Sequence, residues 1–227
     1  MHYVLKVRCK TPIAMGKAGF YSGLDAVLLH RLCLWTGGDI DAARERMPLE
    51  RDGELWACGG GYNPQDALFL SRTAPKRMPV FRLFLRDGGF REMAALPPDD
   101  LQTQINAFFG QETEATGDAY AVVRNARELH FRFRSTDPEQ VLYLLRVEPF
   151  LGPGHSVGWG EIERVDLEEK GETDALWVYT DPLNRLTRPV PMDWTGVDGQ
   201  ESLSALEAPY WSMSKVPARV PYPVGVR

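Results

Sequence analysis

Long apolar runs and paired cysteines are both missing from this sequence of 227 residues. No stretch approaches the roughly 18 consecutive apolar residues of a membrane span, so we expect no membrane-spanning segment. The first residues, Met1–Arg8, alternate like a strand and lack the long apolar core of a secretory signal. The cysteines are Cys9, Cys33 and Cys58, and no two of them form a C-x-x-C pair. We therefore expect buried free thiols in a reducing cytoplasm, rather than disulfides or a structural zinc ion.

Motifs of the common enzyme classes are missing too. The sequence has no G-x-S-x-G nucleophile turn and no glycine-rich loop that ends in Gly-Lys-Ser/Thr. Adjacent carboxylates such as Asp99-Asp100 and Glu168-Glu169 have no histidine cluster beside them, so we expect solvated acids rather than metal ligands. The sequence thus indicates no catalytic site, no metal and no cofactor.

Basic residues are concentrated locally, although the net charge is −5. One stretch contains a single acid, Asp87, and the basic residues Arg72, Lys76, Arg77, Arg82, Arg86 and Arg91. Arg132 and Arg134 belong to a second basic cluster. Local positive patches attract phosphate even in an acidic protein, so these residues are candidate RNA contacts. Solvated strand faces would explain the same pattern equally well.

The residue patterns favour strands that alternate with helices. The expected elements, in order, are a strand over 3–9, a helix over 23–35, a short helix within 39–51, strands over 54–58, 67–71 and 80–85, a helix over 99–109, strands over 119–123 and 129–134, a helix that starts at Pro138, and strands over 161–167 and 175–179. Ser22 is expected to cap the first long helix and Thr136 or Asp137 the last, which Pro149 ends. The core stripe of the first long helix consists of Leu24, Val27, Leu28, Leu32 and Trp35.

Glycines and turn residues divide these elements. Gly59-Gly60-Gly61 predicts a turn or hairpin tip, and Asn125 a turn between two strands. The whole order indicates an α+β fold with a ferredoxin-like core. We expect this core at 1–181, with an insertion at about 39–118, followed by an extended proline-rich C-terminal tail over 182–227.

A glycine-rich segment follows the last helix, and four of the nine residues from Gly152 to Gly160 are glycines. Glycine permits left-handed torsions and a close approach of the backbone to a ligand, and successive exposed N–H groups can bind a phosphate. The order helix, glycines, strand is the reverse of a dinucleotide-binding turn. Candidate RNA contacts here are Gly152, Gly154, His155, Ser156, Gly158, Trp159 and Gly160; the alternative is a plain glycine-rich turn.

Three motifs together resemble the RAMP superfamily of CRISPR proteins. The glycine-rich segment is similar to the loop that lies on RNA in that superfamily. Thr11-Pro12-Ile13-Ala14 followed by Gly23–Leu29 is similar to the opening of the type IV RAMP subunit that corresponds to the Cas-five group, although Ala26 stands where that pattern has glycine. Leu186–Pro191 resembles an arginine-proline segment of the same proteins.

The resemblance implies a non-catalytic, RNA-binding subunit of a type IV CRISPR effector ribonucleoprotein, which serves antiviral defence. Such a subunit caps the 5′ handle of the guide RNA, contacts the repeated backbone subunit and the large subunit, and meets target DNA only through the complex. Two alternatives remain open. One is a guide-RNA-processing endoribonuclease of the same superfamily with His30 as its candidate catalytic residue, and the other is a small-molecule enzyme on an α+β fold.

Overall fold

The computed structural model describes residues 1–13, 22–64, 69–72, 122–152, 160–210 and 213–222. The chain divides into two compact units, one made of Met1–Phe69 with Arg124–Arg227 and the other of Leu70–Val123. Most of the second unit lies outside the described residues, and so do the strand predicted over 80–85 and the helix predicted over 99–109.

Four strands form the main sheet, in the order β4-β5-β1-β6. Their bounds are His2–Ile13 for β1, Phe69–Arg72 for β4, Val122–Arg134 for β5 and Ile162–Lys170 for β6. Strand β1 is antiparallel to both neighbours, so that Leu5 lies opposite Phe131 on one side and Leu167 on the other. Helix α1 (Leu24–Trp35) follows β1, and helix α6 (Pro138–Val147) connects β5 to β6. The predicted α+β class is therefore confirmed.

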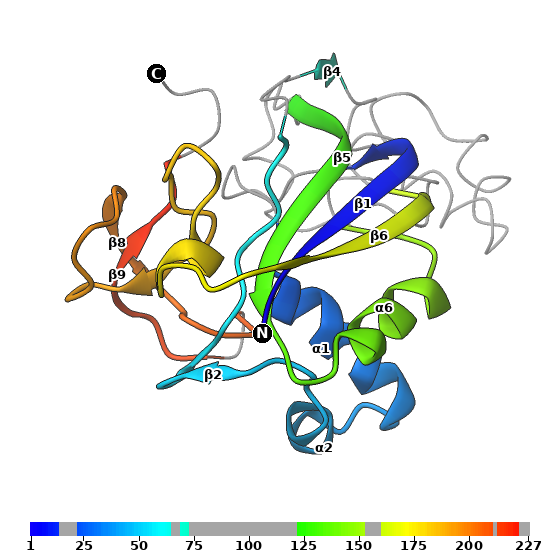
Figure 1. Ribbon diagram of the computed structural model, residues 1–227, viewed down its shortest axis with the longest axis horizontal. Helices are drawn as coiled ribbons and strands as arrows, with labels where there is room; N and C mark the ends of the chain where they lie inside the picture. Colours follow the sequence, from blue (N-terminus) through cyan, green and yellow to red (C-terminus); the bar gives the residue numbers. More distant parts are fainter. Residues whose placement is uncertain (14–21, 65–68, 73–121, 153–159, 211–212, 223–227) are drawn as a thin grey trace, which may run out of the picture. The chain divides into compact units, whose positions relative to one another are not determined.

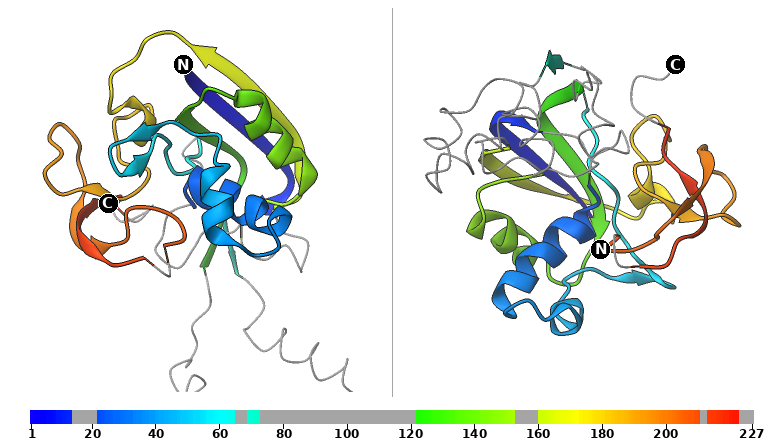
Figure 2. Two further views of the ribbon diagram at one scale, coloured as in Figure 1. Left: turned by 90° about the horizontal axis from the view of Figure 1, so that it is seen from below. Right: turned by 180° about the vertical axis from the view of Figure 1, so that it is seen from behind.

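The two long helices lie against the same face of the sheet formed by β5, β1 and β6 (Figures 1 and 2). Because side chains alternate between the faces of a strand, one side of each strand points to these helices. In β5 that side consists of Leu129, Phe131 and Phe133, each at most 1% exposed. The helices complete this core with Leu24, Leu28, Leu32, Val141, Leu144 and Leu145.

Helix α1 starts without the side-chain cap that the sequence predicts. Its N-cap is Gly23, not Ser22, and the N–H of Leu24 donates to Gly59 O at 3.1 Å. A neighbouring stretch of backbone thus takes the place of a capping side chain. At the other end Trp35 is 43% exposed instead of buried, since its ring packs at the surface on Tyr143 of α6, with centroids 5.4 Å apart.

Helix α6 starts as predicted, with Asp137 accepting a hydrogen bond from the N–H of Gln140 and Pro138 in the first turn. The turn predicted at Asn125 is wrong, because β5 runs through this position as one strand. Strand β1 extends to Ile13, beyond its expected end at residue 9, and Ile13 lies opposite Ala126, next to the predicted turn.

Gly59-Gly60-Gly61 is buried and is not a hairpin tip. The segment runs along β5, with Cys58 bridged to Phe133 and Tyr62 to His130. A Cβ on Gly59 would lie 2.5 Å from Val178 O, so glycine is required here by the close approach of two backbone segments.

The residues that precede Gly59 also belong to the first unit, which contains the main core. Leu49, Trp56 and Cys58 are core residues, so the unit that interrupts the core begins near Leu70 rather than near residue 39. The expected short helix is α2, Ile40–Glu45. Two short strands follow it, β2 at Arg51–Asp52 and β3 at Leu55–Trp56.

The C-terminal part is folded, and the extended tail predicted from residue 182 is wrong. It forms a sheet in the order β7-β9-β8, with bounds Val190–Pro191 for β7, Gln200–Ser204 for β8 and Val216–Val220 for β9 (Figure 1). A second apolar cluster consists of Leu55, Val178, Tyr179, Leu186, Val190 and Val197. The strand predicted over 175–179 is instead a 3-10 helix at Trp177–Tyr179, whose Val178 and Tyr179 pack into this cluster.

Candidate functional site

A short ladder of backbone hydrogen bonds, located between α6 and β6, joins the two ends of the glycine-rich segment. Leu151 N donates to Gly160 O at 2.8 Å, and Ile162 N donates to Pro149 O at 2.7 Å. We call the two paired stretches, Pro149–Gly152 and Gly160–Ile162, the neck. The candidate residues Gly154, His155, Ser156, Gly158 and Trp159 lie outside the described residues. The neck sets where the chain between Gly152 and Gly160 begins and ends.

The outgoing side of the neck is held by the end of β1. The hydroxyl of Thr11 accepts a hydrogen bond from Glu161 N at 2.8 Å, and Lys10 N donates to Glu161 O at 2.8 Å. The thiol of Cys9 donates to Gly160 O at 3.6 Å. Burial, with a smaller contribution from the Glu161 carboxylate, raises the pKa of Cys9 to about 12. The thiol therefore stays protonated and can donate its hydrogen bond to Gly160 O.

Both glycines that end the neck have left-handed torsions, with φ of 82° at Gly152 and 70° at Gly160. A Cβ on Gly160 would lie only 2.0 Å from Leu151 O, inside the neck itself. The geometry of the ladder therefore requires glycine at 160, whether or not a ligand approaches. From the sequence Gly160 was a candidate RNA contact, with a plain glycine-rich turn as the alternative, and its close approach to Leu151 O could not be predicted.

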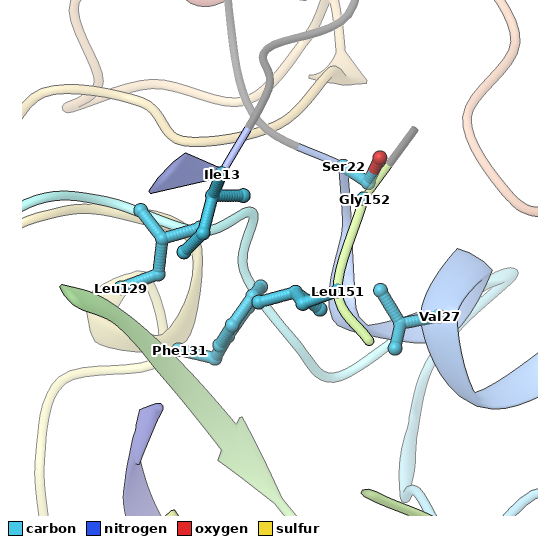
Figure 3. A pocket seen from close by; sticks show the side chains of 7 residues that line it. All are labelled: Ile13, Ser22, Val27, Leu129, Phe131, Leu151 and Gly152. Atoms are coloured by element: carbon cyan, nitrogen blue, oxygen red, sulfur yellow. The ribbon is translucent and has the colours of Figure 1, made fainter. Parts of the chain in front are cut away.

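A small pocket lies under the neck (Figure 3). It is bounded by the end of β1, the start of α1, the core side of β5 and the incoming side of the neck; its lining residues are Ile13, Ser22, Val27, Leu129, Phe131, Leu151 and Gly152. The Ser22 hydroxyl is the one polar side-chain group among these lining residues. Among the described lining residues a phosphate would find no charge partner, so this lining gives no support for anion binding.

A buried ion pair joins the start of α1 to the C-terminal part. Arg188 Nη2 lies 3.1 Å from Asp25 Oδ2, and the side chains are 1% and 0% exposed. Arg188 Nη1 donates to Cys58 O at 3.1 Å, and the hydroxyl of Tyr210 donates to Asp25 Oδ1 at 2.9 Å. Burial has the largest single effect and opposes the charge of Arg188, but Asp25, together with Tyr210, Cys58 and Tyr179, outweighs it. The pKa of Arg188 therefore lies above its ordinary value.

The opening motif therefore contacts each of the other two motifs on which the resemblance rests. Thr11 of the opening motif contacts the neck of the glycine-rich segment, and Asp25 of the same opening pairs with Arg188 of the Leu186–Pro191 motif. Thr187 of that motif also accepts a hydrogen bond from Gly60 N at 3.1 Å. All three motifs are visible in the sequence, but the pairing of Asp25 with Arg188 is not, because 163 positions separate the two residues.

The two arginines of β5 that were candidate RNA contacts are engaged within the protein. Arg132 Nη1 donates to the carbonyls of Trp177, Thr180 and Asp181 at 2.9–3.2 Å. Its guanidinium carbon lies 4.7 Å from the centre of the Trp177 ring. Arg134 forms an ion pair with Asp52. Arg72 belongs to β4, while Lys76, Arg77, Arg82, Arg86 and Arg91 lie outside the described residues.

The sheet face opposite the helices carries both positive and negative side chains, and the two signs balance each other along β1 and β6. Its cations along β1 and β6 lie close to carboxylates: Lys6 to Glu168 at 2.8 Å, Arg8 to Glu163 at 3.4 Å, Lys10 to Glu161 at 2.7 Å and Arg164 to Asp166 at 2.7 Å. Neighbouring carboxylates reduce the local positive potential that a phosphate backbone requires. This face is therefore a poor candidate for phosphate binding.

His30, the candidate catalytic residue of the endoribonuclease alternative, projects from α1 with its side chain 61% exposed. Its Nε2 atom lies 3.8 Å from Glu148 Oε2, which also lies 3.5 Å from Arg31 Nε. Within the described part of the chain, no three His, Cys, Asp or Glu side chains gather as a metal site would require. Nor is any described helix both long and apolar enough to cross a bilayer.

Comparison with known protein families finds no match for this chain, and no curated protein matches its sequence.

Proposed function

We propose that this chain is a non-catalytic, RNA-binding subunit of a type IV CRISPR ribonucleoprotein, built on the ferredoxin-like core of the RAMP superfamily. The connectivity supports the fold part of this proposal. Apart from the short elements α2, β2 and β3 between α1 and β4, the chain order is β1-α1-β4-β5-α6-β6. With the sheet order β4-β5-β1-β6 and helices on one face, this agrees with a split β-α-β-β-α-β arrangement.

The observation that carries the proposal is the neck of the glycine-rich segment. The segment lies between α6 and β6, and its neck contacts Thr11 of the opening motif. A chain rich in glycine presents backbone N–H groups to a phosphate without obstruction by side chains. In the proposal this segment contacts the backbone of the guide RNA at its 5′ handle, and Trp159 offers a ring on which a splayed base stacks.

The positive charge for phosphate binding comes, in this proposal, from the basic stretch Arg72–Arg91, which begins at the last residue of β4 and precedes β5 in the sequence. The cations of β1 and β6 contribute little because carboxylates neutralise them. The repeated backbone subunit and the large subunit are the protein partners, and target DNA is reached through pairing with the guide.

The test is assembly of the complex around a repeat-containing RNA. The chain is co-expressed with a backbone subunit, a large subunit and that RNA, and the RNA retained after purification is quantified at several salt concentrations. The triple variant Arg77→Ala, Arg82→Ala and Arg86→Ala should retain less RNA, with a salt slope smaller by roughly 0.7 per lost phosphate contact.

The matched control removes the same number of charges from the balanced sheet face, with Lys6→Ala, Arg8→Ala and Arg164→Ala. It should leave RNA retention and the salt slope unchanged. A wild-type complex that assembles without RNA, or equal losses in both triple variants, would contradict the proposal. A defined cut in the repeat RNA that disappears in His30→Ala would favour the endoribonuclease instead.

A further inference from the structure

Arg31 is a buried arginine in α1 whose side chain reaches the chain that leaves α6. Its Nη2 atom donates to Glu148 O at 3.0 Å and to Phe150 O at 2.7 Å. Its Nε atom lies 3.5 Å from Glu148 Oε2, and its side chain is 3% exposed. One guanidinium thus holds two carbonyls, two residues apart, on the incoming side of the neck.

A charge in this position is costly. Burial lowers the pKa of Arg31 to about 10, an effect that Glu148 only partly offsets, so the side chain still carries its charge near neutral pH. Within the described part of the chain its Nη1 atom has no hydrogen-bond partner. Because an apolar side chain often serves stability as well as a buried ion pair does, stability alone gives little reason for an arginine here.

The carbonyls that Arg31 holds lie where the chain changes direction. Helix α6 ends at Val147, and Glu148 is already extended, with φ −112° and ψ 108°. The next residues, Pro149 and Leu151, provide the acceptor and the donor that close the neck. Fixing Glu148 O and Phe150 O therefore fixes the direction from which Leu151 meets Gly160.

We propose that Arg31 is the positioning residue of the neck. It orients the incoming strand, while Thr11 holds the outgoing strand from the opposite side. Together they fix the positions of Gly152 and Gly160, the two ends of the neck. That this positioning serves RNA binding rests on the proposed function; that Arg31 provides it does not.

The experiment compares the double variant Arg31→Met/Glu148→Gln with wild type in the assembled complex and as the full chain alone. The second substitution avoids leaving the Glu148 carboxylate without its partner. Amide hydrogen exchange is measured at Leu151 and Ile162, whose N–H groups close the neck, and at Phe131 in the core strand. Exchange at the two neck amides should accelerate by about tenfold or more while Phe131 is unchanged, since only the neck opens.

The matched control is Arg44→Met/Glu207→Gln, which removes an arginine–glutamate ion pair between α2 and the C-terminal part. It should leave the neck amides and RNA retention unchanged. Arg31→Lys keeps the charge but can hold the two carbonyls less completely, so it should accelerate exchange at the neck amides to a smaller extent. If the double variant fails to fold, this single variant still tests the positioning role. Unchanged neck exchange in both Arg31 variants, or equal acceleration at Phe131, would overturn the positioning role.

RNA retention separates this inference from the proposed function. A loosened neck should lower retention several-fold, and retention that stays at the wild-type level would overturn the link between the neck and RNA. If the wild-type complex holds no RNA at all, the proposed function fails, while the exchange data still decide what Arg31 does.

Discussion

Asp25 and Arg188 form an ion pair in the protein interior although 163 positions separate them in the sequence. Asp25 stands in the first turn of α1, and Arg188 lies just before β7 in the C-terminal part. Both side chains are fully enclosed, and Tyr210 donates its hydroxyl hydrogen to the same carboxylate. The pair therefore ties the C-terminal part to the helix that also supports the neck.

Removal of one partner of this pair should strongly destabilise the protein. Asp25→Asn leaves the Arg188 guanidinium without its counter-charge in the interior, which typically costs about 3–5 kcal/mol. The free energy of unfolding from urea titration measures this loss. Asp166→Asn, which breaks an exposed pair with Arg164, is the control and should cost about 0–1 kcal/mol. If both variants lose the same free energy of unfolding, the buried pair stabilises the protein no more than the exposed pair does.

Gly160→Ala should loosen or unfold the neck even when no ligand is bound. The added Cβ would lie 2.0 Å from Leu151 O, and φ at this position is 70°. We expect a clear fall in the midpoint of thermal unfolding, because both the contact and the torsion are unfavourable for alanine. Gly171→Ala is the matched control, since a Cβ there meets no atom within 4 Å, and its midpoint should stay close to wild type. Identical midpoints would contradict the described neck geometry.

Glu168 should titrate below the ordinary range of a glutamate. Hydrogen bonds from Lys170 and then Lys6 lower the pKa of Glu168 to about 2. A folded-state pKa below the unfolded value means that this stabilisation is present above the unfolded pKa and is lost as pH falls from about 4.5 towards 2. NMR titration of the Glu168 side chain measures the midpoint.

Lys170→Met should raise this midpoint, because it removes the larger of the two hydrogen-bond effects. Since the carboxylate is exposed to solvent, added salt should shift it the same way. A wild-type midpoint at the ordinary glutamate value would rule out the described Lys6–Glu168–Lys170 contacts.

Two of the three thiols should resist alkylation in the native protein. Burial raises the pKa of both Cys9 and Cys58 to about 12, and both side chains are inaccessible. The thiolate is the reactive form, so iodoacetamide at about pH 8 should modify partly exposed Cys33 first. Peptide mass spectrometry identifies the modified residues, and the protein unfolded in urea provides the control in which all three react. Rapid native labelling of Cys58 would mean that the Arg188 site opens easily.

Local signals in the sequence were enough to predict several elements. Asp137 and Pro138 fix the start of α6, because a capping carboxylate and a proline suit the first turn and no distant contact is needed. Leu129, Phe131 and Phe133 alternate with polar residues in the sequence, and this alternation matches the side of β5 that faces the core. The family resemblance and the RNA-binding function stay predictions that the experiments above test.

Other features depended on partners that lie far away in the sequence. Gly59-Gly60-Gly61 has the composition of a turn, yet the approach of Val178 and Phe131 makes it a buried strand-like segment. Arg132 has the pattern of an exposed basic residue, yet carbonyls some 45 to 49 positions later bind it.

The sequence alone thus determined the α+β class, the start of α6 and the alternation of the core strands, because these follow from interactions between residues a few positions apart. The tertiary structure alone decided that the C-terminal part folds into a sheet, that Arg188 is buried against Asp25, and that Arg31 and Thr11 hold the neck from two sides. The physical reason is that a buried charge or a close-packed glycine is defined by its neighbours in space, and the chain brings those neighbours together only when it folds.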